Sequence, residues 1–153
     1  MTIATDFDGT IVTHEYPRIG KEIPFATETL KMLIKERHRI ILWTVREGKL
    51  LDEAVEWCRE RGVEFYAVNK DYPEEDIEHL PHGFSRKVKV DLFIDDRNLG
   101  GIPDWGTIYR MVHSGHPYRA LARNEDDCYG ENTLPKRKSF FQHIFGMKEG
   151  EKR

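Results

Sequence analysis

The sequence contains few cysteines and no long apolar run, and both shortages limit what kind of protein it can be. Cys58 and Cys128 are the two cysteines in 153 residues, too few for a disulfide framework, which favours a reduced, cytoplasmic setting. No stretch approaches about 18 consecutive apolar residues, and the chain does not open on a basic segment followed by an apolar run. We therefore expect neither a membrane span nor export.

A strong excess of one charge is also lacking. The chain carries 24 Lys and Arg against 27 Asp and Glu, a formal net charge of −3. This mild acidity argues against a general nucleic-acid binder, although residues 136–138 and 148–153 are locally basic. The length suits one domain with its own core and is too short for two of ordinary size. We expect a core over residues 1–112, followed by a partly ordered C-terminal extension over residues 113–153 that ends in a basic tail.

Short apolar runs and amphipathic segments alternate along the expected core. Runs typical of buried strands cover residues 2–6, 39–44, 63–68 and 88–94, and helical periodicity covers residues 25–37 and 49–61. Residues 106–112 fit either a short strand or a short helix. This alternation predicts an α/β fold, a three-layer Rossmann-like arrangement around a central parallel sheet with the first strand inside it. Beyond residue 113, periodicity is weak except near residues 140–145, where a short helix fits.

Polar side chains stand where the expected strands end. Asp6 and Asp8 follow the first run, Thr44 ends the second, and Asp95 and Asp96 follow the fourth. Ligands bind at this edge of an open parallel sheet, where the strand order reverses, so we expect the acids within about 8 Å of Asp6. The alternative for the first stretch alone is a solvated Asp-Gly turn.

Charge counting favours a metal ion at this edge. The four acids carry −4, or −3 if Asp8 is protonated. A lysine at position 87 or 89, near the fourth apolar run, returns only +1. One Mg²⁺, which prefers oxygen ligands, would bring the site to about neutral and let a phosphate anion enter. We therefore predict that a Mg²⁺ ion lies among these acids.

In order, these segments resemble the motifs of the haloacid dehalogenase-like (HAD) phosphohydrolase superfamily, over residues 1–112. The matching segments are Asp6-Phe7-Asp8-Gly9-Thr10, Leu42-Trp43-Thr44, a lysine at 87 or 89, and Phe93-Ile94-Asp95-Asp96. The chain also resembles small, uncharacterised members of this superfamily from bacteria of the Bacteroides type, through Pro17-Arg18-Ile19-Gly20, the segment 43–48 and the segment 94–98. Cap domains of the superfamily are inserted where this chain has only residues 11–24 and 69–85, so we expect no cap.

The resemblance implies a role for each motif residue. Asp6 would attack phosphorus, and Asp8 would protonate the leaving oxygen and then activate water. Mg²⁺ would be held by Asp6, the backbone carbonyl of Asp8 and Asp96, with Asp95 sharing the metal or orienting its waters. Thr44 and a lysine would bind the phosphoryl oxygens, and we favour Lys87 over Lys89, since Lys89 alternates with valines on the expected strand.

Three arginines are candidates for binding the substrate, each against a structural alternative. Arg46 follows Thr44 and suits an anionic group, but it could equally pair with surface acids. Arg18 and Arg97 are weaker candidates. His79-x-x-His82 and His113-x-x-His116 lack a cysteine at zinc-site spacing, so we do not predict zinc.

The sequence thus predicts a Mg²⁺-dependent phosphomonoester hydrolase that acts through an aspartyl phosphate. The alternatives are a phosphoacceptor switch, disfavoured because no aspartate follows the third strand, and a binding or scaffold protein on the same fold. We expect a phosphorylated substrate and neither a membrane nor a nucleic-acid partner. The identity of the substrate and the oligomeric state, including a homo-oligomer, stay open.

Overall fold

The structure is a computed structural model that describes residues 1–77, 79 and 85–115. These residues lie within one compact unit. The C-terminal helix expected near residues 140–145 and the basic tail lie outside the described residues. No helix in the described part of the chain has the length and apolar character needed to cross a membrane.

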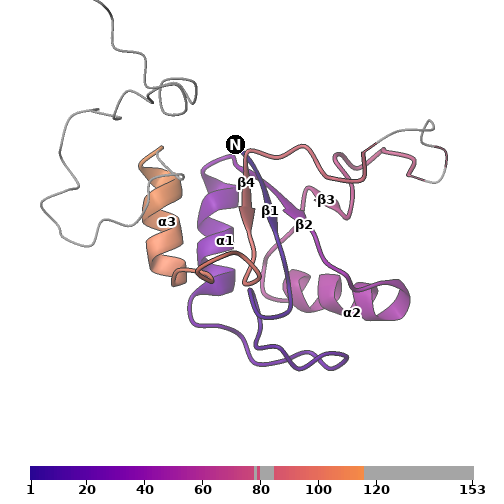
Figure 1. Ribbon diagram of the computed structural model, residues 1–153, viewed down its shortest axis with the longest axis horizontal. Helices are drawn as coiled ribbons and strands as arrows, with labels where there is room; N and C mark the ends of the chain where they lie inside the picture. The colour runs from indigo at the N-terminus through magenta and orange to yellow at the C-terminus, as the bar shows by residue number, and fades with distance from the viewer. Residues whose placement is uncertain (78, 80–84, 116–153) are drawn as a thin grey trace, which may run out of the picture. The chain divides into compact units, whose positions relative to one another are not determined.

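Four parallel strands form the centre of the fold (Figure 1). They are β1 (Thr2–Thr5), β2 (Arg39–Leu42), β3 (Ala67–Val68) and β4 (Leu92–Ile94), in the spatial order β3-β2-β1-β4. The chain therefore extends the sheet in one direction from β1 and then returns to the other side of it with β4. The predicted parallel α/β fold of the Rossmann type is confirmed, with β1 in the interior of the sheet.

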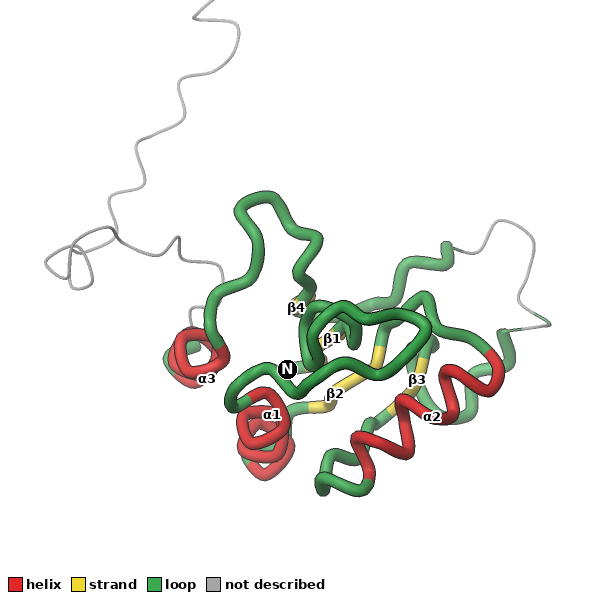
Figure 2. The backbone as a smooth tube through the Cα atoms, turned by 90° about the horizontal axis from the view of Figure 1, so that it is seen from below, coloured by secondary structure: helices red, strands yellow, loops and turns green. Residues whose placement is uncertain are grey.

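Three helices accompany the described sheet. They are α1 (Ala26–Lys35), α2 (Gly48–Arg59) and α3 (Trp105–His113). Since β1, β2 and β3 follow one another across the sheet, right-handed crossovers place α1 and α2 on the same face, and α3 packs beside α1 (Figure 2). Residues 106–112, which fit a strand or a helix by sequence, are thus helical and belong to α3. Asp104 caps the start of this helix, since its side chain accepts a hydrogen bond from the Thr107 N–H at 3.0 Å.

Two strands are shorter than their apolar runs predicted, and in both cases the backbone has other partners. Residues 63–68 were expected to be a strand, but the Val63 N–H donates to the Cys58 carbonyl at 3.0 Å and so caps α2, leaving only Ala67–Val68 in the sheet. Residues 88–94 were expected to be a strand, but the Lys89 N–H donates to Asp71 Oδ1 at 2.7 Å, and the strand begins at Leu92.

The loop after β1 replaces any cap domain in the described part of the chain. It folds back on itself through isolated bridges between Asp8 and Val12 and between Val12 and Glu22. Ile11 and Val12 are fully buried, so the start of the loop packs on the core, whereas residues 13–18 are exposed. The expected absence of a cap in residues 11–24 agrees with this path, and the carboxyl edge of the sheet stays open.

Candidate active site

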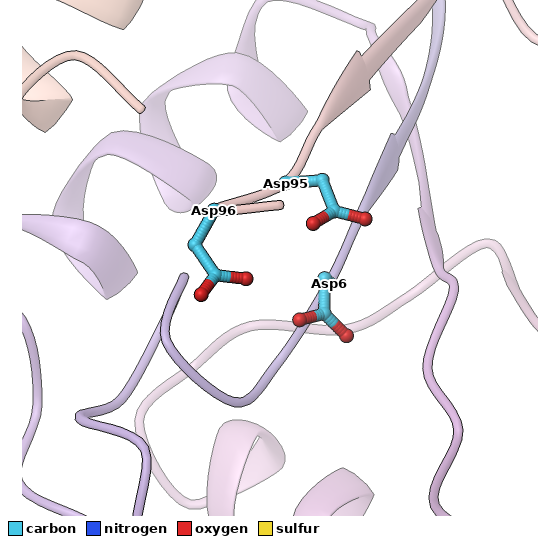
Figure 3. Close-up of side chains that lie close together, drawn as sticks. All are labelled: Asp6, Asp95 and Asp96. Carbon is cyan, nitrogen blue, oxygen red and sulfur yellow. The ribbon is translucent and has the colours of Figure 1, made fainter. Parts of the chain in front are cut away.

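The register of the sheet brings the first and last acidic segments together. Thr5 pairs with Ile94, and the Asp6 N–H continues this pairing by donating to the Ile94 carbonyl at 3.0 Å. Asp6 and Asp95 are thus the next residues on neighbouring strands. Carboxylate oxygens of Asp6, Asp95 and Asp96 lie within 4.8 Å of one another and face a common space (Figure 3). The three acids are therefore as close as predicted from the strand order.

Asp96 is held in this cluster by the turn that follows β1. Its N–H donates to the buried Thr10 Oγ1 at 3.0 Å, and the Thr10 carbonyl accepts a hydrogen bond from Trp105 Nε1 at 3.0 Å. Gly9 has a φ of 89°, and a Cβ there would lie 2.4 Å from Asp96 Oδ2. Position 9 therefore needs glycine for two reasons, its left-handed backbone and the space that the Asp96 carboxylate occupies.

Asp95 is oriented by its own turn. Its Oδ1 accepts a hydrogen bond from the Arg97 N–H at 2.8 Å, and its carbonyl accepts one from Asn98 Nδ2 at 2.7 Å. Both Asp95 and Asp96 belong to the cluster with Asp6. The structure thus leaves both acids as ligand candidates.

The three clustered acids form no ion pair with a cationic side chain in the part of the chain that the structure describes. Partial burial, together with the charges of Asp95, Asp96 and Asp8, raises the pKa of Asp6 to about 6, against the hydrogen bond from the Phe7 N–H. Asp96 Oδ1 is buried and accepts no hydrogen bond from any described residue. A buried acceptor without a donor among three carboxylates matches what a hard cation requires, so these residues fit a Mg²⁺ ion.

Asp8, two residues after Asp6, lies in a very different environment. Arg46 Nε donates to Asp8 Oδ2 at 2.6 Å, and Arg46 Nη2 donates to Asp8 Oδ1 at 2.7 Å. The side chains of Arg46 and Asp8 are 0% and 6% exposed. Arg46 was predicted to bind the substrate, and the structure corrects this, because its guanidinium is buried and already forked onto a carboxylate.

Arg46 also joins the loop after β1 to the loop after β2. Its Nη1 donates to the Pro17 carbonyl at 3.0 Å and its Nη2 to the Arg18 carbonyl at 2.8 Å. The guanidinium carbon lies 5.1 Å from the centroid of the Phe7 ring and 5.3 Å from that of the Tyr16 ring. One buried side chain thus fixes the positions of Asp8 and residues 16–18 together.

Thr44 is positioned by an asparagine that the sequence did not single out. The Thr44 N–H donates to Asn69 Oδ1 at 2.8 Å, and Thr44 Oγ1 accepts a hydrogen bond from the Arg46 N–H at 3.3 Å. Asn69 has a φ of 53° directly after β3, a conformation that asparagine tolerates better than most residues. An asparagine at a strand end was the only signal for this role.

The structure does not bring Lys87 to the acids. Lys87 is exposed, its Nζ lies 5.4 Å from the centroid of the Phe93 ring, and it lines a separate shallow hollow formed with residues 69–71. Because β4 begins at Leu92, a lysine at position 87 or 89 precedes the strand, whereas the acids follow it. The predicted role of Lys87 at the phosphoryl group is therefore not supported by its position.

A pocket of about 420 Å³ opens over the clustered acids. Its lining comprises Asp6, Asp8, His14, Tyr16, Trp43, Thr44, Val45, Asp95 and Arg97. Of the other two arginine candidates, Arg97 lines this pocket, whereas the side chain of Arg18 is 82% exposed, lies 3.7 Å from Glu15 and is not part of the lining. Trp43 is partly exposed and forms part of the wall.

Comparison with known proteins identifies one solved relative. No protein-family model matches the chain, and no curated protein does. A solved structure described as that of a conserved protein coded by a locus of Bacteroides thetaiotaomicron is 66% identical in sequence, with a TM-score of 0.70. The match covers 86% of this chain and 98% of that chain.

Proposed function

Because the chain belongs to the same family as the conserved Bacteroides thetaiotaomicron protein, whose description names no activity, we propose its function from the site itself: a Mg²⁺-dependent phosphomonoester hydrolase of the HAD-like type. The observation that carries the proposal is the clustering of the Asp6, Asp95 and Asp96 carboxylates within 4.8 Å at the carboxyl ends of β1 and β4. Ligands bind at this position in open α/β sheets.

Mg²⁺ would be held by Asp6, Asp96 and the Asp8 carbonyl, with Asp95 as a further ligand or a support for bound water. Once bound, it neutralises charge on the phosphoryl group and on the acids around it. The buried, unpartnered Asp96 Oδ1 and the raised pKa of Asp6 both support a cation at this place.

Asp6 is the nucleophile in this proposal. One of its oxygens forms a bond to phosphorus while the bond from phosphorus to the ester oxygen breaks, and the leaving oxygen takes up a proton. Water then attacks the aspartyl phosphate, which releases inorganic phosphate and restores the carboxylate. None of the pocket-lining residues that the structure describes is a serine or cysteine, so neither type of nucleophile competes with Asp6 there.

Asp8 keeps the proposed role of general acid and base, and the structure adds a condition to it. Both of its oxygens accept one hydrogen bond each from Arg46, so a transferred proton would have to occupy one of the remaining lone pairs of these oxygens. Thr44 and Arg97 line the pocket and supply a hydroxyl and a positive charge to the phosphoryl oxygens. Without a lysine at the described part of the pocket, Arg97 carries more of this task than the sequence indicated.

A phosphoacceptor switch on the same fold is the second reading of such a site. Receiver domains carry their acceptor aspartate after the third strand, where this chain has Asn69, and Asn69 is engaged with the Thr44 N–H. This position favours hydrolysis over signalling. Cytoplasmic location stays a prediction from the cysteine content.

The test is a panel of phosphorylated sugars, nucleotides and phosphopeptides assayed for phosphate release with and without Mg²⁺. We expect turnover with Mg²⁺ and none in EDTA. Release of phosphate at the same rate in EDTA would contradict the metal requirement. A stable phosphoprotein that forms from a small phosphodonor without releasing phosphate would instead support the switch.

A further inference from the structure

The wall of the pocket beside the nucleophile is aromatic and apolar. Trp43 follows β2 at the level at which Asp6 follows β1, since Thr5 pairs with Leu42 and the Trp43 N–H donates to the Thr5 carbonyl at 2.8 Å. Asp95, Asp6 and Trp43 thus form one row across three neighbouring strands, which lie about 4.8 Å apart in such sheets. Acids occupy one end of the row and an indole the other.

The rim of the pocket continues this apolar wall. Tyr16 is 50% exposed and Val45 is 89% exposed, and both line the pocket. Exposed apolar side chains grouped at the mouth of a pocket usually mark the place of a ligand. Phosphoryl transfer is in line, so the leaving group lies on the side of phosphorus away from Asp6, within the pocket that Tyr16 and Val45 also line.

The aromatic rim is also preorganised. The guanidinium carbon of Arg46 lies 5.3 Å from the Tyr16 ring centroid. The same side chain donates hydrogen bonds to the carbonyls of Pro17 and Arg18, the two residues that follow Tyr16. A ring held in place by a buried side chain loses little conformational entropy when it binds a ligand. This rigidity suits a flat ligand that packs against a ring.

The charges of the pocket-lining side chains restrict which leaving alcohol the ester can carry. Arg97 is the one arginine or lysine among the described residues that line the pocket, which also holds His14 and the carboxylates of Asp6, Asp8 and Asp95. Arg97 and a bound Mg²⁺ together match a single phosphoryl group. A further anionic group on the leaving alcohol would meet carboxylates without a partner of its own.

We propose that the substrates are aryl phosphomonoesters, in which a neutral aromatic ring carries the phosphoryl group and packs against Trp43, Tyr16 and Val45. This inference rests on the proposed function, because it identifies the alcohol half of the ester. It distinguishes aryl phosphates from sugar phosphates, whose hydroxylated rings gain little from an apolar wall, and from substrates with several phosphates.

The test measures binding separately from turnover. Benzylphosphonate and cyclohexylmethylphosphonate are not hydrolysed, have similar size, and differ in whether the ring is aromatic. Their dissociation constants would be measured by calorimetry on the full chain with Mg²⁺. We expect benzylphosphonate to bind about threefold to tenfold more tightly, the range of a single favourable aromatic contact.

Substitutions in the aromatic wall test whether that wall causes the preference for benzylphosphonate. Tyr16→Leu keeps an apolar side chain but removes the ring, so the ratio of the two dissociation constants should fall toward one. Tyr72→Leu is the matched control, since Tyr72 is 48% exposed and does not line the pocket, and it should leave the ratio unchanged. Val45→Ser, at an exposed position where folding is not at risk, should weaken both phosphonates.

Equal affinities in the unmodified protein, no binding of either phosphonate, or a ratio that Tyr16→Leu does not change would overturn the proposal. Hydrolysis of sugar phosphates as fast as aryl phosphates would also overturn it, while leaving the hydrolase function intact. Tight benzylphosphonate binding in a protein that hydrolyses no ester would show the reverse, namely a correct ligand class and a wrong reaction.

Discussion

Asp6 and Asp8 are two residues apart, yet the structure surrounds their carboxylates in opposite ways. Asp8 is buried with a guanidinium that satisfies both of its oxygens, whereas Asp6 meets two further carboxylates, Asp95 and Asp96, and no described cation. A buried acid with a complete partner holds loops in place. A group of neighbouring carboxylates without a cationic partner among the described residues is instead a candidate for binding a ligand. The difference makes Arg46 the partner of the Asp8 carboxylate and leaves the carboxylates of Asp6, Asp95 and Asp96 as the proposed ligands of a cation.

The largest effect should come from Asp6→Asn, which keeps the size of the side chain and removes the nucleophile. We expect phosphate release to fall by roughly a thousandfold or more, with an unchanged far-ultraviolet circular dichroism spectrum. Steady-state assays on the best ester of the panel measure this. Near-normal turnover by the variant would assign the chemistry to another residue.

Breaking the buried pair should mainly affect stability. Arg46→Met leaves Asp8 buried without its partner, and such changes cost about 3–5 kcal/mol in the free energy of unfolding. Urea denaturation measures the difference. Arg59→Met is the control, because it breaks the ion pair with Glu56 on the exposed surface of α2, and its midpoint should hardly move. Similar losses in the two variants would show that the Asp8 pair has no special structural role.

Metal binding should stabilise the folded protein at the uncompensated acids. At a Mg²⁺ concentration about a hundredfold above the dissociation constant, linkage gives about 2.7 kcal/mol. The gain should disappear as the pH falls below about 6, because protons then compete with the metal for Asp6, whose pKa is raised to that value. Thermal melting with and without EDTA between pH 5 and pH 8 checks it. A gain independent of pH would place the metal elsewhere.

The last prediction is the most specific to the comparison of Asp6 with Asp8. It concerns whether Asp6→Asn raises or lowers the free energy of unfolding. The pKa of Asp6 is raised from 3.8 to about 6 in the folded state, so its contribution to stability is present below about pH 4 and is lost as the pH rises through 6. In EDTA at pH 7, Asp6→Asn should therefore be more stable than the unmodified protein, and the two should converge below pH 4. Arg46→Met should stay destabilised at pH 7.

The sequence predicted the acid cluster because strand order brings the first and the last acidic segments together. Asp6, Asp95 and Asp96 follow apolar runs, and any parallel sheet with β1 and β4 adjacent brings them together. Arg46 could not be placed in this way, since its contact with Asp8 depends on the conformation of two irregular loops. Lys87 was misplaced for a related reason, because the irregular path before Leu92 has no periodicity from which its direction could be inferred.

The position of β4 has a consequence for how the folded state opens and closes. β4 lies at an edge of the described sheet and is joined to it through a register that pairs residue 3 with residue 92. At its carboxyl end, like charges on Asp95 and Asp96 push it away from Asp6. A cation bound there would hold the carboxyl ends of β1 and β4 together. The backbone amides of β4 should then exchange with deuterium faster in EDTA than in Mg²⁺, while those of β2 are unaffected.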